Sequence, residues 1–107
     1  MINQNLYFCS VNDLKQKKYI IKFFECIKDE LIIFIDENQK IRVYSSICPH
    51  FGGEIIYNSL QGVLQCKWHG WKFNKSSGKC INYPIRSKLK EYEFKQKDNK
   101  IYIITND

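Results

Sequence analysis

The chain carries only two histidines, and each lies within three residues of a cysteine. The first pair is Cys48-Pro49-His50 and the second is Cys66-Lys67-Trp68-His69, separated by the fifteen residues 51–65. Thiolate sulfur and imidazole nitrogen are common ligands of zinc and of iron–sulfur centres. Two such pairs in a chain with no other histidine indicate a metal centre more strongly than they indicate ordinary buried side chains.

The composition of each pair bears on which metal is bound. Finger-type zinc sites usually place two cysteines in one segment and two histidines in the other, whereas here each segment supplies one of each. This mixed pairing suits two metal ions side by side, and a [2Fe–2S] cluster with two Cys on one iron and two His on the other requires it. A zinc-stabilised structural module is the alternative. A nucleophilic Cys66 with His69 as its base would account for only two of these four residues, whereas metal ligation accounts for all four.

The residues around these pairs resemble a known family. Cys48-Pro49-His50-Phe51-Gly52-Gly53 and Cys66-Lys67-Trp68-His69-Gly70-Trp71-Lys72-Phe73 are similar to the two cluster-binding segments of Rieske proteins. The form is most similar to Rieske ferredoxins and to the amino-terminal Rieske domain of ring-hydroxylating oxygenases. The resemblance implies one [2Fe–2S] cluster in a small antiparallel β fold, with both segments at one tip. It assigns the inner iron to Cys48 and Cys66, and the outer iron, near the surface, to His50 and His69.

The resemblance also implies roles for residues next to the ligands. Gly52, Gly53 and Gly70 would let backbone N–H groups approach the cluster, because glycine has no side chain and tolerates positive φ. Ordinary turn glycines are the alternative. Trp71 would lie close to the cluster too, where it either screens the iron from water or belongs to the core.

Four positions bear on the reduction potential. The high-potential branch of the family has an extra cysteine in each segment, and these two form a disulfide; the matching residues here are Gly53 and Trp68. That branch also places Ser and Tyr hydroxyls after the second His-Gly, where this chain has Trp71 and Phe73. Fewer hydrogen-bond donors to the cluster predict a potential near the lower end of the Rieske range, about −150 mV.

Length and composition limit the number of domains, the cellular compartment and the chance of a membrane span. With 107 residues, 44% hydrophobic and 26% charged, the chain is predicted to be one globular domain, 1–107. An odd number of cysteines without an export signal favours a reducing compartment, the cytoplasm. The apolar runs are too short for a membrane span. Cys9, Cys26 and Cys80 show no ligand spacing and are expected to be small buried apolar residues.

Short β-favouring runs separated by turns about every ten residues predict an all-β fold. The expected elements are a strand Leu6 to Cys9, a helical turn from the capping sequence Ser10-Val11-Asn12-Asp13 through Lys17, a strand Tyr19 to Ile27, a hairpin of Leu31 to Ile35 and Lys40 to Ser46, strands Gly62 to Cys66 and Trp71 to Asn74 with a turn at Ser76-Ser77-Gly78, and a hairpin of Lys90 to Lys97 and Lys100 to Thr105 joined at Asp98-Asn99. Tyr92 and Phe94 alternate with charged residues, which is typical of a half-buried strand. The strand order stays open.

The function that the resemblance implies is one-electron transfer. The chain would be a ferredoxin component, without a catalytic site of its own, that takes electrons from a flavoprotein reductase and passes them to a terminal oxygenase or similar redox enzyme. A small Rieske subunit of a nitrite reductase-like enzyme is the alternative. The dinucleotide and nucleotide-phosphate motifs are missing, so electrons are expected to come from another protein. Nucleic-acid binding is disfavoured because acidic residues alternate with the basic ones. The oligomeric state is open, and a monomer is compatible.

The net charge of +6 comes largely from lysine. Lys15, Lys17, Lys18 and the cluster from Arg86 to Lys100 are expected to be solvated surfaces. A docking surface for acidic redox partners is the alternative, and it predicts reduction kinetics that depend on salt.

Overall fold

The computed structural model describes residues 3–47, 54–58, 60–67, 71–81 and 88–106. Its elements are β1 (Asn3–Ser10), α1 (Val11–Lys17), β2 (Tyr19–Phe24), the 3-10 helix η1 (Glu25–Ile27), β3 (Asp29–Ile35), β4 (Ile41–Ser45), β5 (Ile55–Asn58), β6 (Val63–Cys66), β7 (Lys72–Phe73), β8 (Phe94–Lys97) and β9 (Lys100–Asn106). They form a first sheet β1-β9-β8, a central sheet β2-β3-β4 and a third sheet β5-β6-β7, all antiparallel. The predicted all-β antiparallel class is confirmed.

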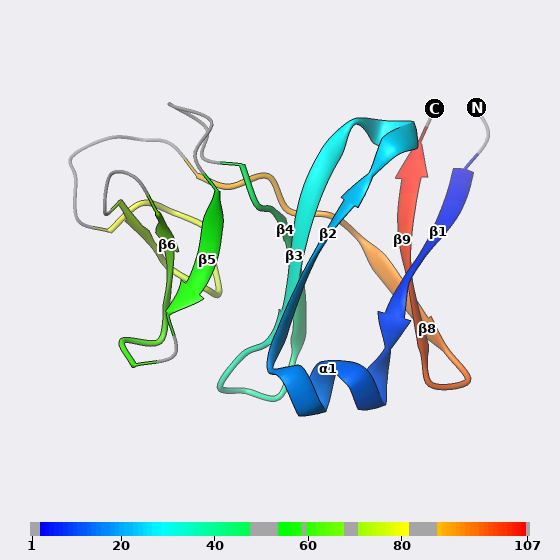
Figure 1. Ribbon diagram of the computed structural model, residues 1–107, viewed down its shortest axis with the longest axis horizontal. Coiled ribbons are helices and arrows are strands. Elements are labelled where there is room, and N and C mark those ends of the chain that lie inside the picture. The colour runs from blue at the N-terminus through cyan, green and yellow to red at the C-terminus, as the bar shows by residue number, and fades with distance from the viewer. Residues whose placement is uncertain (1–2, 48–53, 59, 68–70, 82–87, 107) are drawn as a thin grey trace.

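The central sheet lies between the other two (Figure 1), and its strands β3 and β4 contribute buried residues to a core on each face. Alternate residues of β3 enter different cores, which explains why the run from Leu31 to Ile35 is continuously apolar instead of alternating. The first core, against the first sheet, contains Phe8, Cys9, Leu14, Phe24, Leu31, Ile33, Val43, Ile101 and Ile103. The second core, against the third sheet, contains Ile32, Phe34, Tyr44, Ile55, Leu64, Cys66, Phe73 and Leu89.

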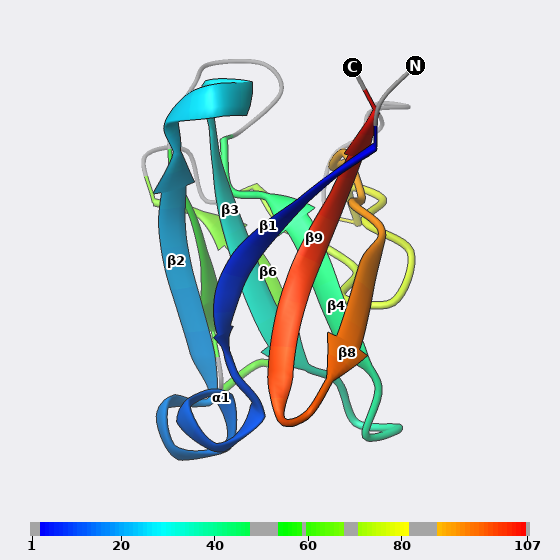
Figure 2. The same ribbon diagram turned by 90° about the vertical axis from the view of Figure 1, so that its right-hand side faces the viewer.

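Two local predictions are confirmed in atomic detail. The Asp13 N–H donates to the Ser10 hydroxyl at 3.0 Å, so Ser10 caps α1. The second is the Asp98-Asn99 turn, where both residues have positive φ, 51° and 66°. Positive φ at both central positions matches the twist of a two-residue hairpin, and Asp and Asn tolerate it better than most side chains. The turn joins β8 to β9 at the lower end of the molecule in Figure 2.

The structure corrects the bounds of two predicted strands and adds one strand that was not predicted. The strand expected over Tyr19 to Ile27 ends at Phe24, because η1 and the left-handed Lys28 turn the chain back toward β3. The strand expected over Lys90 to Lys97 is divided, since Glu91 bridges Tyr44 of β4 and only Phe94–Lys97 pairs with β9. This stretch therefore joins the first sheet to the central sheet. β5 was not among the predicted strands.

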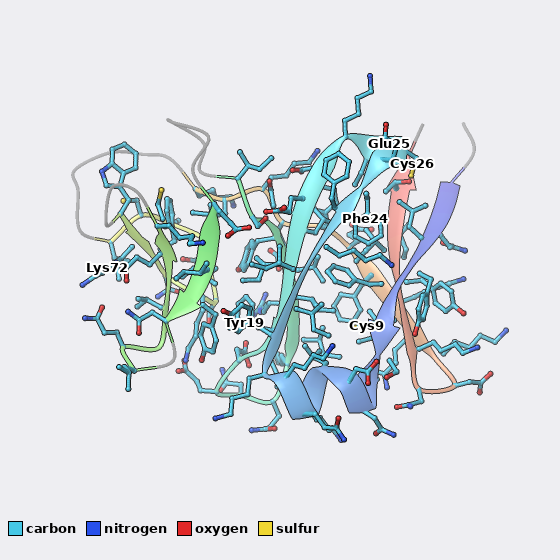
Figure 3. All side chains as sticks on the ribbon, viewed as in Figure 1. Cys9, Tyr19, Phe24, Glu25, Cys26 and Lys72 are labelled. Carbon is cyan, nitrogen blue, oxygen red and sulfur yellow. The ribbon has the colours of Figure 1, made fainter. Side chains whose placement is uncertain are left out.

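The three remaining cysteines do not share one environment. Cys9 is buried in the first core, and its burial, with the nearby Asp13 carboxylate, raises the pKa of its thiol to about 11. Cys80 is half-buried against the second core. Cys26 is exposed, which contradicts the prediction, because η1 projects from the end of the central sheet (Figure 3). No helix among the described residues is long and apolar enough to cross a membrane.

Candidate metal centre

The predicted ligands fall in two stretches of the chain. Cys66 ends β6 and is described. The other predicted ligands and the predicted neighbour glycines lie outside the described residues; these are Cys48, His50, His69, Gly52, Gly53 and Gly70. The structure therefore defines the site through Cys66 and through the residues on either side of segments 48–53 and 68–70.

The two ends of segment 48–53 are paired with each other. Ile47, the residue before the segment, forms an antiparallel bridge with Glu54, the residue after it. One residue further out, the Ile55 N–H donates a hydrogen bond to the Ser46 carbonyl at 2.6 Å. The chain thus enters and leaves the first predicted cluster-binding segment at one place.

The ends of segment 68–70 lie beside that place. The Cys66 N–H donates to the Trp71 carbonyl at 2.8 Å, and the Lys67 N–H donates to the Glu54 carbonyl at 3.0 Å. Ile55 and Cys66 are partners in the β5–β6 register. The described ends of both segments therefore meet at one end of the β5–β6 hairpin, as expected for two cluster-binding segments at one tip.

Cys66 has surroundings that suit an inner metal ligand. Its side chain is fully buried in the second core, among Ile55, Leu64 and Phe73. The thiolate is the form that binds metal, and a buried anion is costly unless a cation neutralises it. An iron ion bound by Cys66 would supply that cation in a place that excludes water, so this residue fits such a group.

The two aromatic residues after the second segment pack in or against the second core. Phe73 is fully buried in the second core, and Trp71 packs against the same core while half-exposed. Neither ring has a hydroxyl, so these two positions offer no O–H donor to a cluster sulfur. The packing of Trp71 favours its interpretation as part of the core.

Sequence reasoning missed a polar cluster beside these ends, formed by Glu30, Ser46, Glu54 and Lys67. The Ser46 hydroxyl donates to a Glu30 carboxylate oxygen at 2.9 Å, and the Glu54 Oε1 lies 3.2 Å from the Lys67 Nζ. Burial raises the pKa of Glu30 and its hydrogen bond with Glu54 raises it further, while the Ser46 hydroxyl opposes the shift. The sequence signal for this cluster was modest: two oppositely charged residues, Glu54 and Lys67, directly follow segment 48–53 and Cys66.

Fold and site together define an antiparallel β domain in which one end of the β5–β6 hairpin brings the ends of two chain segments together. A family model for the Rieske [2Fe-2S] domain matches residues 4–93. The chain belongs to the Rieske [2Fe–2S] domain family, whose members bind one [2Fe–2S] cluster. Membership therefore favours the cluster over zinc, and electron carriage is the function that it supports.

Curated relatives contain this domain as a small part. A cholesterol 7-desaturase of Drosophila melanogaster is 31% identical over 86 residues, 73% of this chain and 20% of the relative. The oxygenase subunit of a 3-chlorobenzoate-3,4-dioxygenase from Comamonas testosteroni is 37% identical over 68 residues, 63% of this chain and 15% of the relative. The chain thus spans a fifth or less of the length of these relatives.

Solved structures share the fold nearly end to end. The plasma membrane Rieske protein of Synechocystis PCC 6803 has a TM-score of 0.79 at 21% identity, covering 92% of this chain and 97% of that one. The ferredoxin of Sphingomonas yanoikuyae B1 has 0.78 at 19% identity, covering 96% and 100%. A putative NADH-dependent nitrite reductase small subunit from Mycobacterium tuberculosis has 0.71 at 13% identity, covering 100% and 99%. At these identities the comparisons show the fold alone.

Proposed function

We propose that this chain is a ferredoxin component that carries single electrons from a flavoprotein reductase to a terminal oxygenase. The observation that carries the proposal is the meeting of the described ends of both segments beside the fully buried Cys66, in a chain of the Rieske family. The 3-chlorobenzoate dioxygenase relative and the Sphingomonas ferredoxin, which belong to oxygenase and ferredoxin classes, support this direction.

The proposed ligands are those read from the sequence. Cys48 and Cys66 hold the inner iron, and His50 and His69 hold the outer iron. When bound, the cluster supplies a one-electron acceptor of less negative charge than an all-cysteine cluster, because neutral imidazoles replace two thiolates. The second core keeps water away from Cys66, and the paired ends of the two segments hold the ligand-bearing stretches together.

No catalytic residue is assigned in this chain. A Rieske oxygenase performs its chemistry at a separate mononuclear iron that needs two further histidines and a carboxylate. Both histidines of this sequence are already committed to the cluster. We therefore place substrate oxidation in a partner enzyme and treat residues 1–107 as one electron-transfer domain that works in the cytoplasm and is compatible with a monomer.

A small Rieske subunit of a nitrite reductase-like enzyme is the second candidate. The Mycobacterium tuberculosis neighbour shares its fold with the whole of this chain. The carrier chemistry is the same in both cases and only the acceptor differs. Purification from the native source decides between them: a stable complex with a large reductase subunit favours this second candidate, and a free carrier favours the ferredoxin.

The proposal is tested first on the purified chain. Visible and EPR spectra, together with iron and acid-labile sulfide assays, are expected to show one [2Fe–2S] cluster with mixed ligands. His50→Ser and His69→Ser are expected to abolish or alter the cluster, while Cys9→Ser, at a buried cysteine of the first core, leaves it in place. A colourless chain that holds zinc and no inorganic sulfide refutes the proposal.

The donor and acceptor are tested by stopped-flow mixing. A flavoprotein reductase should reduce the chain, and a terminal oxygenase should reoxidise it within one turnover. Salt is expected to slow both steps if the exposed lysines dock acidic partners.

A further inference from the structure

Glu54 and Lys67 flank the two segments and contact each other. Glu54 is the first residue after segment 48–53, and Lys67 is the residue directly after Cys66. They are joined twice, by the hydrogen bond from the Lys67 N–H to the Glu54 carbonyl at 3.0 Å and by the ion pair of their side chains at 3.2 Å. Each side chain therefore stands at the point where one ligand-bearing stretch meets the other.

Exposure argues against a role in global stability. The Lys67 side chain is 52% exposed and that of Glu54 is 36% exposed. An ion pair exposed to this degree contributes about 0–1 kcal/mol to folding because water and salt screen it. The charges of the pair would nevertheless act on a cluster bound through Cys66. Such a cluster becomes more negative when it gains an electron, so a nearby positive charge would favour its reduced state.

The pair is also anchored to the central sheet. The backbone carbonyl of Glu30 in β3 accepts from the Ser46 N–H at 2.7 Å, and the Glu30 carboxylate accepts from the Ser46 hydroxyl at 2.9 Å. The chain leading into segment 48–53 is thus tied to β3, and the residue following the segment is joined to that chain by the bridge between Ile47 and Glu54. This arrangement fixes the described ends of segment 48–53 against the central sheet.

A second ion pair provides a matched comparison. Lys75 Nζ lies 2.8 Å from Glu37 Oε2, and it joins the chain after β7 to the β3–β4 turn. It has the same chemistry, with a lysine side chain that is 13% exposed and a carboxylate that is 63% exposed, and neither residue flanks segment 48–53 or 68–70 in the chain. Any effect that depends on a position next to the cluster must be missing from this pair.

We propose that Glu54 and Lys67 are positioning residues that hold the described ends of the two segments together, and that the positive charge of Lys67, the chain neighbour of Cys66, favours the reduced cluster. This inference rests on the proposed function. Removal of Lys67 should lower the reduction potential, since Glu54 is left uncompensated, and removal of Glu54 should raise it. A purely structural role would move both variants in the same direction.

The experiment compares Lys67→Met, Glu54→Gln, the double variant and the control Lys75→Met as holoproteins. Against a reference dye, the equilibrium constant for one-electron reduction should fall about threefold in Lys67→Met and rise about threefold in Glu54→Gln, as expected of a screened charge. The double variant should return close to the wild type, and Lys75→Met should leave the constant unchanged. Shifts in one direction, or none, overturn the inference.

Two further measurements guard against failure to load the cluster. If Lys67→Met loses iron, Lys67→Arg should restore it; loss that arginine does not restore overturns the inference. In the chain as isolated, the amide of residue 67 should exchange with solvent about threefold faster in both single variants and in the double, but not in Lys75→Met. Unchanged exchange overturns the positioning role, whereas wild-type protein without iron or sulfide overturns the proposed function alone.

Discussion

Phe34→Ala should separate the third sheet, which ends in Cys66, from the rest of the fold. Phe34 is fully buried on β3, where its ring stacks on Tyr57 of β5 at 5.4 Å between centroids and on Tyr44 of β4 at 6.0 Å. It therefore bridges the central and third sheets. The substitution removes most of this contact and leaves a cavity between the two sheets.

The magnitude follows from the burial. Replacement of a fully buried Phe by Ala costs about 3–5 kcal/mol, from lost transfer free energy and the cavity together. Domains of this size have unfolding free energies of about 5–15 kcal/mol, so the loss is a large fraction. The expected fall in melting temperature is about 15–25 °C.

The assay is urea and thermal unfolding followed by circular dichroism, with iron release from the holoprotein as a second signal. The matched control is Phe23→Ala on β2 of the same sheet, where the side chain is 52% exposed, and its expected cost is below about 1 kcal/mol. We also expect iron to leave Phe34→Ala faster than it leaves the control. A loss in Phe34→Ala no larger than that of the control would refute the reasoning that this stack holds the third sheet in place.

Three further predictions concern the titration of Glu30, the partly buried hydrogen bond between Tyr92 and Asp29, and the reduction potential of the cluster. The pKa of Glu30, which faces Asp29 and Glu54, is raised in the folded state, so folding favours the protonated carboxyl group. The contribution of Glu30 to the free energy of unfolding is therefore complete below about pH 4.3 and is lost as pH rises through the raised pKa. Glu30→Gln should therefore gain stability over wild type as pH rises to about 7, and thermal unfolding with a flat difference across that range would contradict this. Tyr92→Phe removes the hydrogen bond that Tyr92 donates to Asp29 at 2.5 Å and should cost about 1–3 kcal/mol in urea unfolding, while a cost near zero would show the bond to be dispensable. Redox titration should give a potential near about −150 mV, and a value well above zero would contradict the role assigned to the missing hydroxyl donors.

Features that depend on neighbours in the chain were predictable from the sequence. The types and spacing of the four ligands indicated the cluster, because metal coordination depends on donor chemistry and on reach. The capping by Ser10 and the Asp98-Asn99 turn were also readable, since both depend on contacts within three residues. Family membership confirmed the cluster, while the ligand assignments of Cys48, His50 and His69 remain predictions.

Features that depend on distant partners were decided only by the tertiary structure. β5 is four residues long, and its local pattern did not reveal a strand that exists through pairing with β6. Residue Glu91 bridges β4 instead of continuing the last hairpin, and Cys26 is exposed because a 3-10 turn ends β2 early. The Glu54–Lys67 contact likewise forms across thirteen positions of the chain. Local propensity carries no information about such contacts, because they form only when distant strands are brought together by the burial of both faces of the central sheet.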